Sequence, residues 1–184
     1  MHAVLAQPEP PAAHLEWLEA TYREHSRTVL RAAYRVTGSA SDAEDVLQTV
    51  FLRLVRRETL PNLSGGAAPY LRRAAVNAAI DLVESRRARR SDPLDTVPPA
   101  ATRDRTAGPD RRHLARELGR ELRRAVATLG GRSAEMFVLR YFEDLDNRDI
   151  AEMYDTSPGT VAVTLHRART QLKAALGSYL GDAS

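Results

Sequence analysis

A set of hydroxyl, imidazole and cationic side chains near the C-terminus has the spacing needed to bind duplex DNA. Apolar residues in the segment 158–176 lie four, three, four and four positions apart: Val161, Leu165, Ala168, Leu172 and Leu176. This period predicts a helix with one buried stripe. The opposite face carries Thr160, Val163, His166, Arg167, Thr170 and Lys173, with Arg169 on its flank. Such side chains bind phosphates and base edges in a major groove.

The residues before this helix predict a shorter helix and a tight turn. Asp146 or Asn147 can cap the shorter helix, and Ile150, Ala151 and Tyr154 give it an inward face. A turn at 155–157 follows, in which Ser157 can cap the second helix and Pro158 occupies its first position. The segment 145–176 therefore predicts a helix-turn-helix, with Gly159 at the start of its second helix and Arg148 near enough to bind phosphate. The alternative is an ordinary core helix with a solvated charged face.

Composition narrows the class of protein. The chain has 184 residues, a net charge of +3, a pI near 9.6 and no cysteine. The charge is a mild nucleic-acid signal, and the lack of cysteine excludes a disulfide framework and the usual zinc fingers. No apolar run approaches the roughly 18 residues of a membrane span, and the first 14 residues lack the pattern of a signal peptide. We therefore expect a cytoplasmic protein with a disordered tail at 1–13.

No candidate active site emerges from the sequence. The five histidines do not share metal-ligand spacing with carboxylates, and no glycine-rich phosphate loop is present. The sequence therefore predicts no catalytic residue, cofactor or metal site.

A break in the helical pattern divides the chain into two parts. Segment 91–112 holds four prolines, four aspartates and four arginines without helical periodicity, which is typical of a flexible linker. The parts on either side, 14–90 and 113–180, show no strand-like alternation. The predicted fold class is all-α, with two small helical domains joined by a flexible linker.

The N-terminal part predicts three helices. The inward face of the first is Leu15, Leu18, Tyr22, His25, Val29, Ala33 and Val36, and Gly38 ends it. Ser41 and Glu44 form a capping box for the second, whose inward face is Ala43, Leu47, Val50, Phe51 and Leu54. After a loop at 58–69, the third runs from about 68 to 90, with Leu71, Ala74, Ala75, Ala78 and Leu82 inward.

Two further helices are expected ahead of the helix-turn-helix. Leu114, Leu118, Leu122, Val126 and Leu129 mark the inward face of the first. The second runs from Ala134 to Phe142.

The order of these parts resembles the extracytoplasmic-function (group IV) sigma factors of bacterial RNA polymerase, within the sigma-70 family. The resemblance spans about residues 15–180 and rests on the motifs DAEDVLQ at 42–48 before Phe51, YLRRAAVNAAID at 70–81, and IAE, GTV and HRAR at 150–152, 159–161 and 166–169. It implies a region 2-like domain at 14–90, for core polymerase and the −10 element, and a region 4-like domain at 113–180, for the −35 element. It also implies core RNA polymerase and promoter DNA as partners, with an anti-sigma factor as a candidate regulator.

The resemblance assigns roles to particular residues. Contacts to core polymerase fall to an acidic and amide row on the exposed face of the second helix, with the aromatic residue after it: Asp42, Glu44, Asp45, Gln48 and Phe51. Contacts to the melted −10 strand fall to Arg73, Asn77, Arg86 and Arg87, with the loop 60–68 as a pocket wall. Contacts to the −35 duplex fall to Arg148, Ser157, Gly159, Thr160, Val163, His166, Arg167, Arg169 and Lys173.

Two features depart from what the family leads us to expect. Ala162-Val163-Thr164 replaces a stretch that is basic in many members, so Val163 offers only apolar contact, for example to a thymine methyl. The linker is expected to thread towards the polymerase active centre, but its arginines cancel its aspartates, and a plain tether serves equally well.

Two other functions stay open from the residues alone. A conventional helix-turn-helix regulator would bind duplex operators without core polymerase. A helical enzyme or ligand-binding bundle would need polar pocket residues, which the sequence does not supply.

Overall fold

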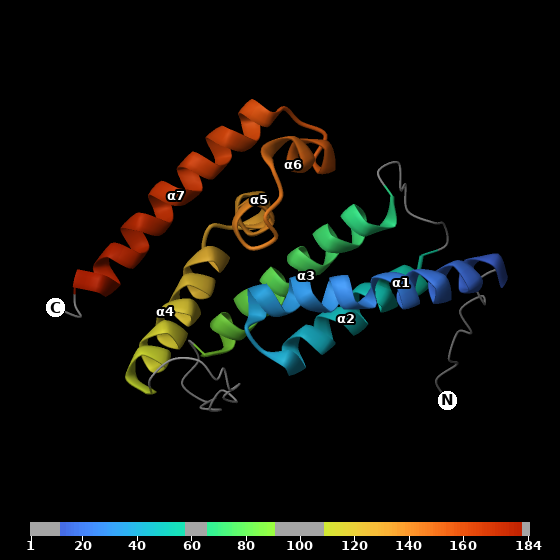
Figure 1. The fold of residues 1–184 in the computed structure, drawn as a ribbon, viewed down its shortest axis with the longest axis horizontal. Helices are drawn as coiled ribbons and strands as arrows, with labels where there is room; N and C mark the ends of the chain where they lie inside the picture. The colour runs from blue at the N-terminus through green and yellow to red at the C-terminus, as the bar shows by residue number, and fades with distance from the viewer. Residues whose placement is uncertain (1–11, 58–65, 91–108, 182–184) are drawn as a thin grey trace, which may run out of the picture.

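The computed structural model describes residues 12–57, 66–90 and 109–181, and all of its regular structure there is α-helical (Figure 1). The helices are α1 (Ala12–Thr37), α2 (Ala40–Val55), α3 (Ala67–Arg90), α4 (Pro109–Ala127), α5 (Gly131–Tyr141), α6 (Asn147–Met153) and α7 (Pro158–Gly181). The predicted all-α class is confirmed. Residues 1–11, 58–65 and 91–108 lie outside the described residues, and with them most of the predicted tail (1–13), loop (58–69) and linker (91–112).

Helices α1, α2 and α3 pack as a three-helix unit around one apolar core. Its most buried side chains include Val29, Val46, Leu54, Leu71 and Val76, each 2% exposed or less. At 20–33 cal/mol per Å², burying such side chains stabilises a fold by about 1.5–3 kcal/mol each. This core holds α3 against both α1 and α2. The exposed residues of α3 are therefore fixed relative to the predicted acidic and amide row on α2.

The inward face of α1 is rotated from the predicted one near its start. Leu15 and Tyr22 are 48% exposed, whereas His14 and Thr21 are buried in their place. His14 is satisfied there because its Nε2 donates to the carbonyl of Leu54 at 3.3 Å. The predicted inward positions Leu15 and Tyr22 are therefore wrong, because a hydrogen-bonded histidine occupies the stripe.

Gly38 ends α1 as predicted, and its conformation explains why glycine is needed. Its φ is +68°, a left-handed value that favours glycine. Its N–H donates to the carbonyl of Tyr34 at 2.7 Å. A Cβ at this position would also lie 2.8 Å from the guanidinium carbon of Arg123, a residue of α4.

The start of α2 differs from the predicted capping box. Ser39, not Ser41, is the N-cap: it has extended backbone angles and its side chain accepts from the N–H of Asp42. The Ser41 hydroxyl bonds instead to Ser39 Oγ and the Asp42 carboxylate. Helix α2 begins two residues after Gly38, at Ala40. Ser39 therefore immediately precedes the free N–H groups of its first turn and caps them, whereas Ser41 already lies within the helix.

Helices α4 to α7 form a second unit around Val126, Met136, Leu139, Ile150 and Val161, each 2% exposed or less. Helix α4 begins at Pro109, inside the predicted linker, since proline is well tolerated at a first helical position. Leu118, predicted to face inward, is 42% exposed.

The two units pack against each other through α3, which contacts α4, α5 and α6. Figure 1 shows α5 beside the middle of α3, with α6 and α7 on the far side of α5. None of the described helices is both long and apolar enough to span a bilayer.

Candidate nucleic-acid and polymerase interface

The first helix of the predicted helix-turn-helix is held by its cap. Asp146 is the N-cap of α6, and its carboxylate accepts from the backbone N–H of Arg148 and of Asp149, both at 2.8 Å. Asp149 completes a capping box by accepting from the N–H of Asp146 at 3.4 Å. Ile150 and Ala151 are the buried residues of this short helix. The predicted cap and inward face are confirmed.

These hydrogen bonds make the helix start sensitive to pH. The N–H groups of Asp149 and Arg148 hold the pKa of the exposed Asp146 carboxyl below its ordinary value. A carboxyl with a depressed folded-state pKa stabilises the fold above its unfolded-state pKa, and this contribution is lost as pH falls.

We therefore expect the Asp146→Asn variant to lose less stability on acidification than the wild type does. Asparagine can still accept from the N–H groups but does not titrate, so one proton-linked contribution is removed. Thermal unfolding between pH 6 and about pH 3 measures this difference. Parallel loss of melting temperature in the two proteins would contradict it.

The second helix of the pair presents the predicted DNA-binding face. Ser157 accepts from the N–H of Thr160 at 3.1 Å, and Pro158 is the first residue of α7. The stripe Val161, Leu165, Ala168 and Leu172 is buried, and Leu176 is half-buried. Exposed on the other side are Gly159, Thr160, Val163, His166, Arg167, Arg169, Thr170 and Lys173. Val163 is 52% exposed, which leaves it available to a partner.

A polar hollow of about 470 Å³ opens where the two helices of the pair meet. It is lined by Arg140, Asp146, Asn147, Arg148 and Pro158. Arg140, which the sequence analysis did not single out, donates to the carbonyl of Leu145 at 3.0 Å. Arg148 is exposed. Arg140 belongs to α5 and comes close to α6 only in the folded chain, so no local sequence pattern connects it with this site.

The predicted −10 residues are spread along α3. Asn77 is half-buried, whereas Arg86 and Arg87 are exposed near the C-terminal end of the helix. Arg73 donates to the carbonyl of Met153 at 2.8 Å, and its guanidinium carbon lies 4.1 Å from the centroid of the Tyr154 ring. The C-terminal unit thus already contacts Arg73.

The predicted polymerase row on α2 is only partly exposed. Glu44, Asp45 and Gln48 are exposed, but Asp42 is 7% exposed, so its predicted place on the exposed face is wrong. Its carboxylate is paired with Arg86 of α3, 44 residues further along the chain. Phe51 is 8% exposed and packs edge-on against Tyr22, with their ring centroids 4.9 Å apart.

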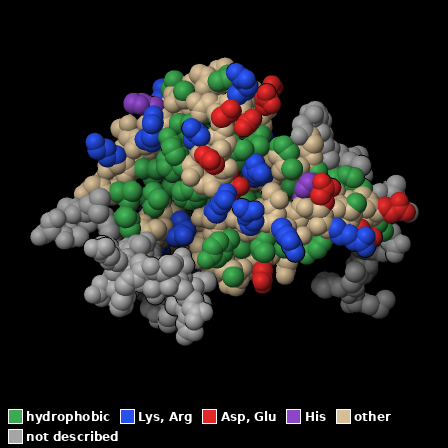
Figure 2. Space-filling view, in the orientation of Figure 1, with side chains coloured by type: hydrophobic (Ala, Val, Ile, Leu, Met, Phe, Trp, Pro, Cys, Tyr) green, Lys and Arg blue, Asp and Glu red, His purple; other side chains and the backbone are tan. Residues whose placement is uncertain are grey.

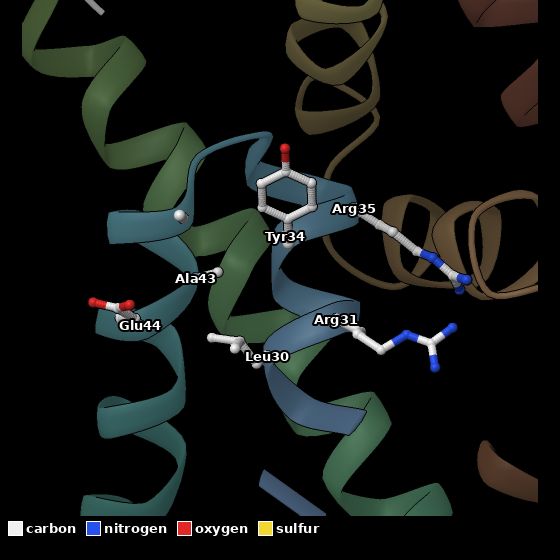
Figure 3. Close-up of a pocket in the computed structure, with 7 residues that line it drawn as sticks. Leu30, Arg31, Tyr34, Arg35, Ala43 and Glu44 are labelled. Atoms are coloured by element: carbon white, nitrogen blue, oxygen red, sulfur yellow. The ribbon is translucent and has the colours of Figure 1, made fainter. Parts of the chain in front are cut away.

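An apolar groove of about 430 Å³ lies between α1 and α2, beside the exposed row. Figure 3 shows Leu30 and Tyr34 of α1 opposite Ala43 of α2, with Glu44 at the outer edge. Arg31 and Arg35 point to the other side of α1, towards the C-terminal helices. Tyr34 is 40% exposed, so the groove combines aromatic surface with one carboxylate, that of Glu44, and Arg31 and Arg35 also contribute to its lining.

The arrangement suits binding through charge and shape. Figure 2 shows Lys and Arg side chains across the middle of one face of the molecule, interspersed with Asp and Glu. Within the described residues, no group of three or more His, Asp or Glu side chains has metal-binding geometry.

Comparison with known proteins agrees with this geometry. Residues 21–90 match the family model described as sigma-70 region 2, and residues 119–172 match sigma-70 region 4. The chain is 31% identical over 175 residues to the RNA polymerase sigma-E factor of Streptomyces avermitilis, covering 93% of this chain and 92% of that protein. It is 30% identical over 176 residues to the ECF RNA polymerase sigma factor SigE of Mycolicibacterium smegmatis, covering 93% of this chain and 65% of that longer protein.

These matches define the class of protein. The chain is a sigma-70 family protein that contains both region 2 and region 4. It is also 30% identical over 167 residues to the ECF RNA polymerase sigma factor SigL of Mycobacterium tuberculosis, covering 90% of this chain and 92% of that protein. Within the sigma-70 family the chain therefore belongs to the extracytoplasmic-function sigma factors, which direct promoter recognition with RNA polymerase.

Proposed function

We propose that this chain binds core RNA polymerase through α1 and α2, the −10 strand through α3, and the −35 duplex through α7. In this assignment residues 14–90 form the polymerase and −10 domain, and residues 113–180 form the −35 domain. The observation that carries it is the capped helix pair α6–α7, whose outer face exposes hydroxyl, imidazole and cationic groups around Val163. The chain acts by binding, and catalysis belongs to the polymerase.

For core polymerase, the exposed Glu44, Asp45 and Gln48 supply charge and amide groups, and the groove at Leu30 and Tyr34 supplies apolar surface. An interface core that is apolar and aromatic with a charged rim is the usual anatomy of a specific protein interface. Asp42 contributes indirectly, because its pairing with Arg86 fixes α2 against α3.

The proposed −10 site places Asn77 at a base edge and Arg73 one helical turn earlier at the backbone. An asparagine amide both donates and accepts, which suits recognition of an unpaired base. Half-burial of Asn77 supports a fixed side chain that is still reachable.

Replacing Asn77 with Ala is expected to reduce open-complex formation by about 1–2 kcal/mol, the size of one hydrogen-bonded contact, while core binding stays near wild type. Permanganate footprinting of melted thymines measures the open complex, and a pull-down measures core binding. Normal melting by the variant would remove Asn77 from the base-reading role.

For the −35 duplex, few cations remain on the outer face of α7, so each one should matter. Arg167→Ala is expected to cost about 1–3 kcal/mol of duplex affinity if the guanidinium contacts a base edge. Ala162→Arg should strengthen binding and steepen its salt dependence by about one unit of slope, because each added phosphate contact releases counterions.

Titration of a labelled promoter duplex with the full chain, over a series of salt concentrations, measures both effects. Arg27→Ala removes an exposed arginine from α1 and is the control for a general loss of positive charge. If Arg167→Ala binds normally and Ala162→Arg leaves the salt slope unchanged, this face of α7 does not meet DNA.

Co-purification with core polymerase separates this proposal from a conventional helix-turn-helix regulator. A regulator would bind duplex DNA alone and would not enrich core subunits. The exposed row and groove on α2 favour the polymerase-dependent function, since a duplex-only binder has no use for them. An anti-sigma factor, if one acts here, would compete for the same surfaces.

A further inference from the structure

Val163 occupies the centre of the outer face of α7. Its neighbours in the buried stripe, Val161 and Leu165, are 0% and 4% exposed, whereas Val163 itself is 52% exposed. Residues three or four positions apart share one face of a helix, so Gly159 and Arg167 lie one turn before it and one turn after it. An aliphatic side chain thus stands in the middle of the face that the proposed function turns towards DNA.

The first two turns of α7 carry no charged side chain. Residues 158–165 read PGTVAVTL, and the first arginine, Arg167, comes only in the third turn. The hydroxyls in these turns are already bonded. Thr164 donates to the carbonyl of Thr160 at 2.9 Å, and the Thr160 hydroxyl shares a hydrogen bond of 2.9 Å with that of Ser157. The surface that this end of the helix offers to a base is therefore mainly aliphatic.

Polar groups follow this aliphatic centre further along the helix. His166 and Arg167 lie in the next turn and Lys173 lies two turns beyond His166, and all three are exposed. The Thr170 hydroxyl donates to the carbonyl of His166 at 3.1 Å, so its hydrogen is not free for a base. Contacts from such cations to phosphates position a protein on the duplex but carry no sequence information directly. Much of the sequence preference therefore falls to Val163.

The chemistry of base edges decides what a valine can recognise. A recognition helix contacts base edges mainly through its N-terminal residues. Thymine is the base that presents an apolar group, its 5-methyl, in the major groove. Against Val163, the polar edge atoms of another base would lose water without gaining a partner, which costs affinity. Valine also keeps nearly a single side-chain rotamer in a helix, so its two methyl groups are held in place at little cost in entropy.

We propose that Val163 selects, in the −35 duplex, a pyrimidine that carries a 5-methyl group over one that does not. Thymine and 5-methylcytosine both carry this group, whereas cytosine and uracil lack it. This selection rests on the proposed function, because it takes the outer face of α7 as the surface that enters the major groove. Methylation of a cytosine at this position would make that base resemble thymine to the protein.

Duplexes that the full chain enriches from a random pool serve as the probe. Each enriched thymine is then replaced by uracil, which removes only the 5-methyl group and keeps the base pair. For the wild type, uracil at the position facing Val163 is expected to weaken binding about 4-fold, which is the transfer free energy of one methyl group expressed as affinity. When 5-methylcytosine and cytosine replace the same thymine, each paired with guanine, the methylated duplex should bind more tightly by a similar factor.

Two variants connect this preference to one side chain. Val163→Ser removes the aliphatic surface and is expected to bind the thymine and uracil duplexes equally. Val55→Ser is the matched control, because Val55 is 42% exposed on α2 and lies outside the proposed DNA contacts. This control should keep the wild-type preference for thymine. Both positions are exposed, so both variants should fold as the wild type does.

Equal binding of the thymine and uracil duplexes by the wild type, at every enriched position, would overturn the selection by Val163. A thymine preference that Val163→Ser keeps in full would overturn it as well, because the methyl group would then be read elsewhere. In both cases the chain still binds a defined duplex, so the −35 assignment stands. If the full chain enriches no duplex sequence at all, the −35 assignment fails and the selection by Val163 fails with it.

Discussion

Reversing the charge of Asp45 is expected to abolish stable association with core polymerase. The Asp45 side chain is 62% exposed, and its one ion pair among the described residues is a long contact of 4.0 Å to Arg86. Its carboxylate is therefore available to a basic partner. Placing Lys there sets like charges against each other, which costs several kcal/mol at an interface, or about 100-fold or more in affinity. A pull-down of core polymerase with the Asp45→Lys variant measures the loss.

Asp81→Lys is the matched control for this prediction. Asp81 lies on α3, is 57% exposed and also makes a 4.0 Å ion pair, with Arg53. Both variants lose the same kind of surface contact, but Asp81 is outside the proposed polymerase row. If Asp45→Lys and Asp81→Lys bind core polymerase with equal affinity, the row on α2 does not contact the polymerase.

Shortening Ile150 to Ala is expected to destabilise the C-terminal unit by about 2–5 kcal/mol. Ile150 is fully buried, and it is the largest buried side chain of α6, which otherwise packs on the core through Ala151 and the partly buried Met153. A helix of seven residues has little stability of its own, so its position depends on this packing. Denaturant unfolding followed by circular dichroism measures the change, and duplex binding should fall with it.

Val163→Ala provides the comparison, because it shortens an aliphatic side chain on the same helix pair at a position that is 52% exposed. Its free energy of unfolding should stay within about 0.5 kcal/mol of the wild-type value. A loss below about 1 kcal/mol for Ile150→Ala would mean that α6 is not anchored as the structure shows.

Local signals predicted the C-terminal helix pair well. The stripe that begins at Val161 follows the helical period, and Asp146 and Ser157 act on N–H groups two or three residues away. Neither feature requires knowledge of the rest of the chain. The end of α1 at Gly38 was predictable for the same reason, since a left-handed residue breaks a helix wherever it occurs.

Features that depend on distant residues were not predictable. The sequence predicts that Asp42 is an exposed acid at a helix start. In the structure, Asp42 is buried and forms an ion pair with Arg86 near the end of α3. Arg73 reads as a free cation, yet Glu135 and Tyr154 of the other unit enclose it. A single sequence shows helical periodicity and capping residues, but it does not show which charged side chains will form ion pairs between helices.

Run-off transcription with purified core polymerase, in the presence and absence of this chain, tests the central claim most directly. The templates are fragments of the source genome, and the readout is discrete transcripts with defined start sites. The account predicts that such transcripts form only when the chain is added, and that Asp45→Lys removes them. Transcripts that are identical with and without the chain, from a preparation that binds duplex DNA, would contradict it and favour a conventional regulator.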